Sequence, residues 1–261
     1  MSGAHPAYGS LRAVTPLAAV VLQDNPSPMT LEGTNTWVLR APDAPVCVVI
    51  DPGEDDERHL RAVAAHGPVA LVLLTHRHHD HAGGARRFQE LTRAPVRALD
   101  PSLVLGSEAL ADGDVVTAAG VELRVVATPG HTSDSLSFLL TPDNAVLTGD
   151  TVLGRGTTVI AHPDGALGPY LESLRRLADL APDTAVLTGH GPELPDVAAV
   201  ANAYLAHREE RLDQVRNALA RLGPRASPRA VVEDVYADVD RALWPAAELS
   251  VRAQLDYLRA E

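Results

Sequence analysis

Short apolar runs recur between residues 46 and 190, and each run is followed by Thr, Gly or Pro or directly by a polar side chain. The runs consist mainly of β-branched residues and leucine, a composition that predicts buried β-strands. We predict such strands at residues 46–50, 71–74, 125–127, 146–147 and 186–187. Each predicted strand leads into a His or an Asp, so polar side chains should collect where the strands end.

Amphipathic segments lie between these strands. Apolar residues three and four positions apart predict helices over residues 55–65, 82–91 and 168–180. Further strands are predicted over residues 14–22, 36–40, 115–117, 121–126 and 135–140. Short strands mixed with covering helices favour a layered α/β (α+β) domain.

The pattern changes near residue 195. Apolar residues three, four or seven apart predict a helix over 196–222, which Gly223-Pro224 ends. Ser227-Pro228 has the form of a helix start, and a last helix is predicted over 245–259. We therefore place a first domain at residues 1–200 and a small helical subdomain at residues 201–261.

The composition is that of an ordinary soluble protein, with 46% hydrophobic and 21% charged residues among 261. No apolar run approaches the roughly 20 residues that a membrane span needs, and the first residues lack the pattern of a signal peptide. Cys47 is the single cysteine, which excludes an internal disulfide and fits a reducing compartment. We expect a cytoplasmic protein that does not contact membranes.

The formal net charge of −12 argues against a protein whose main role is to grip nucleic-acid phosphates. Every one of the 22 basic residues is an arginine. Mechanisms that require a Schiff-base lysine or a phosphate-loop lysine are therefore excluded.

Residues 76–81 read His-Arg-His-His-Asp-His, which places four imidazoles and a carboxylate in six positions. Imidazole and carboxylate are preferred ligands of zinc and similar divalent ions. In an extended segment His76 and His78 project to the same side and can share one ion. Gly83-Gly84 then allows a close approach of the backbone. Six consecutive residues cannot complete two metal sites, so further donors are expected from other strand ends, namely His131, Asp150 and His190.

The complete set of motifs resembles the signature of the metallo-β-lactamase superfamily. The motifs are Thr-His-x-His-x-Asp-His at 75–81, Thr-Pro-Gly-His at 128–131, Thr-Gly-Asp at 148–150 and Gly-His-Gly at 189–191. The resemblance implies a four-layer αββα sandwich with its site at the edge where the two sheets meet. It also assigns the ligands: a first metal held by His76, His78 and His131, and a second held by Asp80, His81 and His190, with Asp150 bridging both.

Two neighbouring positions are interpreted by the same resemblance. Asp51 in Ile-Asp-Pro-Gly corresponds to a buried aspartate that supports the metal loop rather than binding an ion. His79 occupies a variable position of the cluster, which favours a role as a supporting or surface residue over metal binding. Outside the motifs, we predict that His5, His59, His66 and His207 face solvent.

The segments 25–38 and 154–158 resemble the lactamase-beta-2 branch of this superfamily. That branch carries a C-terminal winged-helix-like domain, which suits residues 205–261. Its members include endoribonucleases that act on single-stranded RNA and fungal enzymes that hydrolyse acyl-carrier-protein thioesters. The motifs do not separate an RNA substrate from a small acyl (thio)ester substrate. The oligomeric state is also left open.

Departures from relatives narrow the activity. Di-zinc β-lactamases use a cysteine in the second metal site, whereas Cys47 lies far from every ligand position, so β-lactam hydrolysis is not expected as the main activity. Oxygen-reducing di-iron relatives carry Glu where this chain has His78, which disfavours that branch. We expect two Zn²⁺, with Mn²⁺ or Fe²⁺ as alternatives.

The resemblance implies a dinuclear metallohydrolase in which a metal-bridging hydroxide attacks the scissile bond. Asp150 sets the metal separation, and Asp80 is the candidate to orient the water or receive its proton. Candidate substrate contacts around the site are Asn35, Thr157, Thr158 and His162. A competing hypothesis is a non-catalytic binding or regulatory module, in which metals stabilise a scaffold for the winged-helix-like tail.

Overall fold

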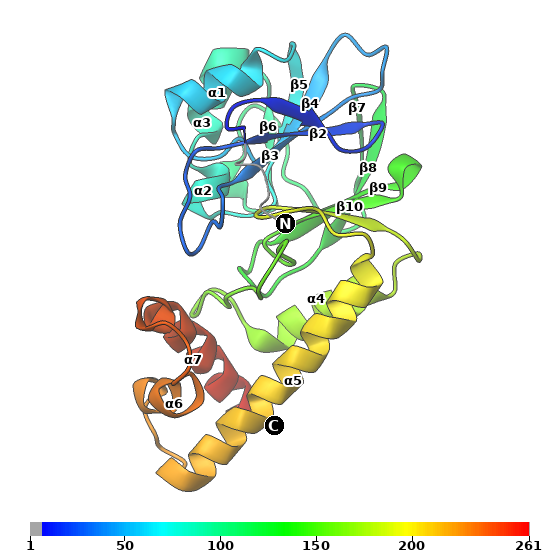
Figure 1. Ribbon diagram of the computed structural model, residues 1–261. Helices are drawn as coiled ribbons and strands as arrows, with labels where there is room; N and C mark the ends of the chain where they lie inside the picture. The colour runs from blue at the N-terminus through cyan, green and yellow to red at the C-terminus, as the bar shows by residue number, and fades with distance from the viewer. Residues whose placement is uncertain (1–6, 261) are drawn as a thin grey trace.

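The computed structural model describes residues 7–260, and Figure 1 shows the order of its helices and strands. The strands of the first half are β1 (Leu11–Ala13), β2 (Ala18–Leu22), β3 (Asn35–Leu39), β4 (Cys47–Ile50), β5 (Val69–Leu73) and β6 (Val96–Arg97). Those of the second half are β7 (Val115–Ala118), β8 (Val121–Ala127), β9 (Leu136–Leu140), β10 (Ala145–Gly149) and β11 (Ala185–Thr188). The α-helices are α1 (Glu57–Ala64), α2 (His79–Ala82), α3 (Ala85–Thr92), α4 (Leu167–Ala178), α5 (Val197–Leu222), α6 (Pro228–Val235) and α7 (Trp244–Ala260).

The strands form two mixed sheets. The first sheet has the order β1-β2-β3-β4-β5-β6 and the second has the order β11-β10-β9-β8-β7. Successive strands from β1 through β4 pair antiparallel, and so do successive strands from β7 through β10. Strands β4, β5 and β6 are parallel to one another, and β11 is parallel to β10. Parallel neighbours have their carboxyl ends on the same side, so the loops that follow them emerge together.

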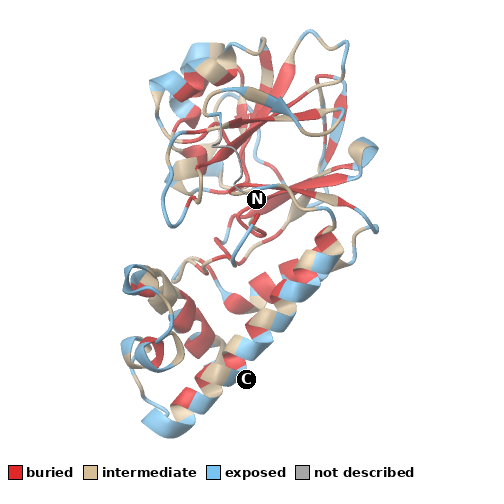
Figure 2. Ribbon diagram, viewed as in Figure 1, coloured by how far each residue is buried: buried red, intermediate tan, exposed pale blue. Residues whose placement is uncertain are grey.

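Alternation along the strands divides the core into layers. In β4, Val48 and Ile50 face the second sheet, while Cys47 and Val49 pack beneath α1 and α3. On the far side, α4 and α5 cover the second sheet around Val146 and Val186. Figure 2 shows the buried residues concentrated in the strands and on the inward faces of these helices. The expected four-layer αββα sandwich is confirmed.

Two similar pentapeptides lie side by side in the second sheet. Val146 pairs with Val186 and Leu147 pairs with Leu187 along parallel strands β10 and β11. Both sequences are Val-Leu-Thr-Gly followed by a metal-ligand type of residue, Asp150 in one and His190 in the other. Their parallel pairing brings these two polar residues to the same edge.

The predicted strand over residues 14–22 is wrong in its first half. The chain instead forms strands β1 and β2 with a turn between them, and β1 pairs antiparallel with β2. Pro16 lacks a backbone N–H and cannot join a ladder, while Asp143 accepts hydrogen bonds from the Thr15 hydroxyl and from the Leu17 N–H. The turn is therefore held by a carboxylate that lies far away in the sequence.

The helix predicted over residues 82–91 corresponds to α3, which begins three residues later than predicted, and a separate short helix precedes it. Helix α2 ends at Ala82 and α3 begins at Ala85, with Gly83-Gly84 between them. A Cβ on Gly84 would lie 2.6 Å from the carbonyl oxygen of Glu54, and the Gly84 N–H donates to Gly53 at 2.7 Å. The close approach expected for this glycine pair is thus present. Strand β6 has two residues and was missed, because so short a run carries no periodic pattern.

The C-terminal helices form the expected small helical subdomain, with a core of its own. Val215 of α5, Val232 of α6, and Trp244 and Leu255 of α7 pack together. Helix α5 runs without a break through residue 200, and its first turns pack on α4. Figure 1 shows α6 and α7 beside the far half of this long helix. None of the helices in residues 7–260 combines the length and the apolar character that a membrane span requires.

Candidate metal centre

The loops after four strands carry the predicted ligands. Residues 76–81 follow β5, His131 follows β8, Asp150 follows β10, and His190 follows β11. Two groups of donor atoms result, within which all atoms lie within 4.8 Å of one another. The structure therefore brings together all seven residues that were predicted to bind metals.

The first group consists of His76, His78 and His131. The Nδ1 atom of His78 lies 3.1 Å from Nε2 of His76 and 2.9 Å from Nε2 of His131. Three imidazole nitrogens that lie this close together have the arrangement of a three-histidine metal site.

The second group consists of Asp80, His81, Asp150 and His190. Nε2 of His190 lies 3.0 Å from Oδ2 of Asp80 and 3.4 Å from Oδ1 of Asp150. Nε2 of His81 lies 3.1 Å from Nε2 of His190. The other carboxylate oxygen of Asp150 lies 3.7 Å from Nε2 of His131 in the first group. Asp150 thus presents one oxygen to each group, as bridging requires.

Hydrogen bonds on the outer side of the rings determine which nitrogen carries the proton. Nδ1 of His131 lies 2.6 Å from the Val159 carbonyl oxygen, and Nδ1 of His190 lies 3.1 Å from that of Gly33. A carbonyl only accepts, so in each ring Nδ1 donates and Nε2 of the neutral ring keeps a lone pair that points into its group. Such outer contacts are how proteins orient histidine ligands.

Asp51 holds the loop that carries the ligands. Its carboxylate accepts hydrogen bonds from the backbone N–H of Thr75 at 2.8 Å and from the Thr75 hydroxyl at 2.6 Å. It also lies 2.8 Å from Nδ1 of His81. Asp51 is buried, belongs to neither ligand group, and adopts a positive φ of 53° that places its side chain under the loop. These contacts support the predicted role of Asp51 as a supporting residue.

The charges of the site suit divalent cations. Burial lowers the pKa of His131 to about 4, so its ring is neutral at pH 7 and available as a ligand. Burial also acts to lower the pKa of His190, but the Asp150 and Asp80 carboxylates outweigh it and raise that pKa to about 9. The second group therefore favours positive charge, which a bound cation supplies.

The donor atoms fit two cations. Oδ1 of Asp150 is buried and accepts no hydrogen bond among the described residues. Nitrogens of His81 and His190 face each other at 3.1 Å, a separation that leaves no room for a proton on both. A cation coordinated by these atoms satisfies the lone pairs that hydrogen bonding leaves unused.

Arg77 lies between the predicted ligands His76 and His78 in the sequence but belongs to neither group of donors. Its guanidinium forms ion pairs with Asp134 at 3.1 Å, Asp100 at 3.2 Å and Asp164 at 3.5 Å. These three acids come from three different loops. Asp164 also accepts a hydrogen bond from the backbone N–H of Ser133, two residues after the ligand His131. Arg77 therefore ties the loop after β5 to the loop after β8.

We expect Arg77→Ala to lower the free energy of unfolding by about 1–2 kcal/mol, because buried Asp134 loses its charged partner. Urea unfolding of the metal-loaded protein measures the change. Arg86→Ala removes an exposed arginine from the neighbouring helix α3 and serves as the control. Equal stability of the two variants would show that the Arg77 network contributes nothing.

The four predicted substrate contacts occupy different environments. Thr157 and Thr158 line a cavity at the metal centre, and the Thr158 hydroxyl donates to the backbone oxygen of Asp150 at 2.7 Å. Asn35 is buried and donates both amide protons to the loop that carries His190, through the carbonyls of Thr188 and Gly191. His162 does not line the cavity and lies 3.0 Å from Asp256 of α7. Asn35 and His162 thus contact other parts of the chain in the structure.

The cavity at the metal centre has a volume of about 330 Å³. One wall comes from the metal domain, with His131 and Asp150, and the other from the C-terminal helices, with His207, Arg208 and Tyr236. The sequence indicated no role for these three residues, because their positions along α5 and directly after α6 carry no motif. His207, which was predicted to face solvent, is half-buried and lines the cavity.

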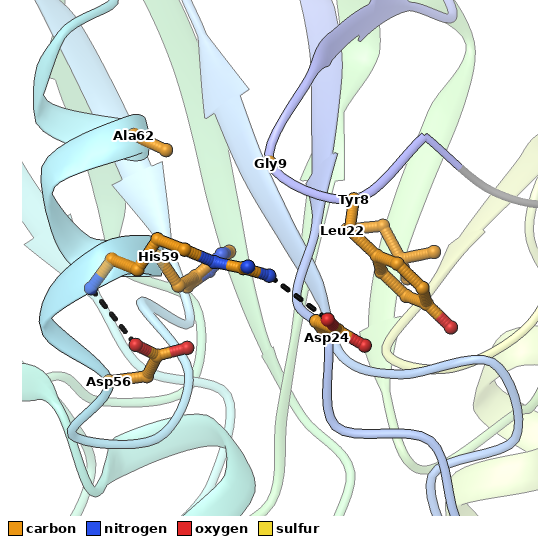
Figure 3. A pocket seen from close by; sticks show the side chains of 8 residues that line it. Tyr8, Gly9, Leu22, Asp24, Asp56, His59 and Ala62 are labelled. Carbon is orange, nitrogen blue, oxygen red and sulfur yellow. Dashed lines mark hydrogen bonds and ion pairs between the residues drawn. The ribbon is translucent and has the colours of Figure 1, made fainter.

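A second cavity, of about 530 Å³, lies between α1 and the N-terminal strands (Figure 3). Arg58 and Asp24 form an ion pair across it at 3.0 Å, and His59 lies at its base. The prediction that His59 faces solvent is wrong, because the ring is 3% exposed and its Nε2 lies 2.9 Å from the Thr36 hydroxyl. The predicted exposure of His5 lies outside the described residues.

His59 gives the protein a specific pH dependence. Burial lowers its pKa from 6.5 to about 4, so the unfolded chain binds a proton that the folded chain refuses between these values. The stability that neutral His59 provides is present above pH 6.5 and is lost as the pH falls towards 4. Between pH 6.5 and 4.5 we expect a loss of about 2 kcal/mol that is absent in His59→Gln. Urea unfolding of both proteins across this range measures it, and parallel pH profiles would contradict the assignment.

An αββα sandwich whose strand ends hold two groups of His and Asp donors defines a metal-binding class of protein. Comparison with known families agrees: residues 29–190 match the metallo-beta-lactamase superfamily, and residues 227–261 match the beta-lactamase associated winged helix domain. The chain therefore belongs to the metallo-β-lactamase superfamily, whose members are mostly hydrolases.

Individual relatives extend the comparison over most of the chain. A beta-lactamase-like protein 2 homolog from Drosophila melanogaster is 31% identical over 273 residues, which cover 95% of this chain and 91% of the relative. An atrochrysone carboxyl ACP thioesterase from Aspergillus fumigatus is 34% identical over 218 residues, covering 79% of this chain and 66% of the relative. A beta-lactamase domain protein from Burkholderia ambifaria shares the fold with a TM-score of 0.80 at 24% identity, over 99% of this chain and 90% of that structure.

Proposed function

We propose that this protein hydrolyses acyl thioesters at a centre that holds two divalent cations, with zinc as the native metal. The observation that carries the proposal is a complete double set of donors that opens into a cavity with a largely apolar lining. A volume of about 330 Å³ suits an acyl chain, because small-molecule sites are concave and mostly apolar. The relative named as an acyl-carrier-protein thioesterase supports this choice of substrate.

The ligand assignment follows the geometry. His76, His78 and His131 would hold the first cation, Asp80, His81 and His190 would hold the second, and Asp150, which presents one oxygen to each group, would lie between them. Two such ions, when bound, supply the Lewis-acid chemistry that ionises water near neutral pH and polarises a carbonyl oxygen.

Asp80 is placed to exchange the proton of the attacking water. Burial opposes its ionisation, but His81 and His190 lower the pKa of Asp80 to about 2, so the group is a carboxylate at neutral pH. Its side chain is 23% exposed, compared with 11% for Asp150. Asp80 can therefore pass a proton to solvent, whereas the more buried Asp150 serves as the bridge.

The test combines metal analysis with a substrate panel. The purified protein is assayed for bound metal and is then given acyl thioesters of N-acetylcysteamine, a labelled single-stranded RNA and a β-lactam. We expect thiol release from the thioesters alone. RNA cleavage without thiol release would overturn the proposal in favour of an endoribonuclease. No reaction by the metal-loaded protein would favour the non-catalytic binding module.

A further inference from the structure

Arg208 of helix α5 is a buried arginine without an acidic partner. Its side chain is 3% exposed, and its guanidinium donates to the backbone oxygen of Thr158. The same group lies over the Tyr170 ring, with 5.1 Å from Cζ to the ring centroid. The Nε atom has no hydrogen-bond partner, and among the ion pairs of residues 7–260 none involves Arg208.

An unpaired buried charge is unusual because it costs free energy. Arginine is almost never fully buried without a partner, and a carbonyl and a ring face replace only part of its hydration. The other two arginines of the cavity lining are less buried: Arg155 pairs with Glu32, and Arg211 donates to the neutral Gln214 side chain at 2.7 Å. Arg208 is the one of the three that is buried, so neither an acid nor solvent compensates its charge.

Arg208 also lies close to the metal centre. It lines the cavity that His131 and Asp150 line from the other side. The residue that accepts its hydrogen bond, Thr158, donates its own hydroxyl to the backbone oxygen of Asp150 at 2.7 Å. Asp150 is the one carboxylate of the lining, and its charge belongs to the metals. An anion that enters the cavity therefore meets Arg208 without a competing acid.

We propose that the acyl group of the substrate carries a carboxylate, and that Arg208 binds this carboxylate inside the cavity. This inference rests on the proposed thioesterase function and names its substrate class. A guanidinium is the side chain best suited to a carboxylate, because its N–H groups match the two oxygens. The anion could lie on the acyl part or on the thiol part of the thioester. The long pantetheine arm keeps a carrier phosphate far from the sulfur, whereas Arg208 is buried beside the metal centre. The position of Arg208 therefore favours a carboxylate on the acyl part.

The first experiment compares matched substrates in the wild-type protein. Succinyl and butyryl thioesters of N-acetylcysteamine have acyl chains of equal length and differ in the terminal carboxylate. We expect kcat/KM to be about tenfold to a hundredfold higher for the succinyl thioester, as for a charged hydrogen bond of 1.5–3 kcal/mol. Butyryl and succinyl thioesters of coenzyme A form the second arm. A preference for the coenzyme A carrier, without a preference for the succinyl chain, would place the anion on the thiol part and overturn the proposal.

Variants then assign the preference to a residue. Arg208→Gln should reduce the succinyl-to-butyryl ratio to about one, and Arg208→Lys, which keeps the charge, should retain part of it. Arg216→Gln changes a partly exposed arginine on the same helix that does not line the cavity, and it should leave the ratio unchanged. An unchanged ratio in Arg208→Gln would contradict the proposal, and the wild-type comparison tests it even where that variant fails to fold.

A binding measurement separates this inference from the proposed function. Protein freed of metal on a chelating resin is mixed with glutarate, and its melting temperature is followed. We expect glutarate to raise the melting temperature of the wild type, to raise that of Arg208→Lys less, and to leave that of Arg208→Gln unchanged. Binding without hydrolysis of any thioester would leave the anion site standing while the proposed function fails. Hydrolysis with neither glutarate binding nor a succinyl preference would refute the anion site alone.

Discussion

Asp150→Asn is expected to lower thioester hydrolysis by about a thousandfold. Asparagine keeps the size of the side chain but removes the charge that faces both groups of ligands, with one oxygen 3.4 Å from Nε2 of His190 and the other 3.7 Å from Nε2 of His131. Metals contribute several kcal/mol of transition-state stabilisation, and about 4 kcal/mol corresponds to a factor of a thousand. Steady-state kinetics measures the loss of hydrolysis, and metal analysis measures any loss of bound metal.

The control for this variant is Asp183→Asn. Asp183 is exposed, and its φ of 57° is a conformation that asparagine accepts as well as aspartate does. The Asp183→Asn variant should keep the metal content and the hydrolysis rate of the wild type. Full activity of Asp150→Asn with two bound metals would refute the bridging role.

Asp51→Asn is expected to weaken metal binding by about 10- to 100-fold without removing a ligand. The carboxylate of Asp51 accepts hydrogen bonds from the Thr75 N–H and hydroxyl and faces Nδ1 of His81. An amide offers one acceptor oxygen in place of two, so either Thr75 or His81 loses its partner. The ring of His81 then lacks the contact that fixes its orientation towards the second cation.

Competition with a chromophoric chelator measures this loss, site by site. Asp55→Asn alters a carboxylate on the same segment that belongs to neither ligand group, and it serves as the matched variant. Metal affinities of Asp51→Asn that equal those of Asp55→Asn would show that Asp51 is dispensable for the centre. Unfolding in urea, measured in parallel, separates a loss of affinity from a loss of fold.

The metal centre was predictable because its ligands follow strands. An apolar run ending in Thr or Gly marks where a buried strand ends, and parallel strands such as β10 and β11 place their following residues together. The spacing within residues 76–81 and the motifs around His131, Asp150 and His190 then identified the candidate ligands. Local sequence also sufficed for α5, α6 and α7, whose start and stop signals lie within a few residues of their ends.

Contacts between distant segments were not predictable in the same way. Pro16 lies in an apolar run, and only the hydrogen bonds of Thr15 and Leu17 with Asp143 show that the first residues of the run form a turn before β2. His59 has an unremarkable sequence context, yet Thr36 and the packing of α1 bury it. Asn35 is near the site, but the loop carrying His190 uses both of its amide protons.

The order of residues along the chain thus determined the candidate donors, the layered α/β class and the helical character of the tail, because these depend on periodicity and on local signals. The four-layer arrangement was implied by the resemblance to the metallo-β-lactamase superfamily. Tertiary structure alone decided what surrounds the donors. The cavity forms where α5, the segment after α6, and α7 meet the loop after β10, which lies at least 40 residues earlier, and the burial of the Arg208 charge exists only in that setting. Burial, and therefore the energetic meaning of a charge, is a property of neighbours that the linear sequence does not specify.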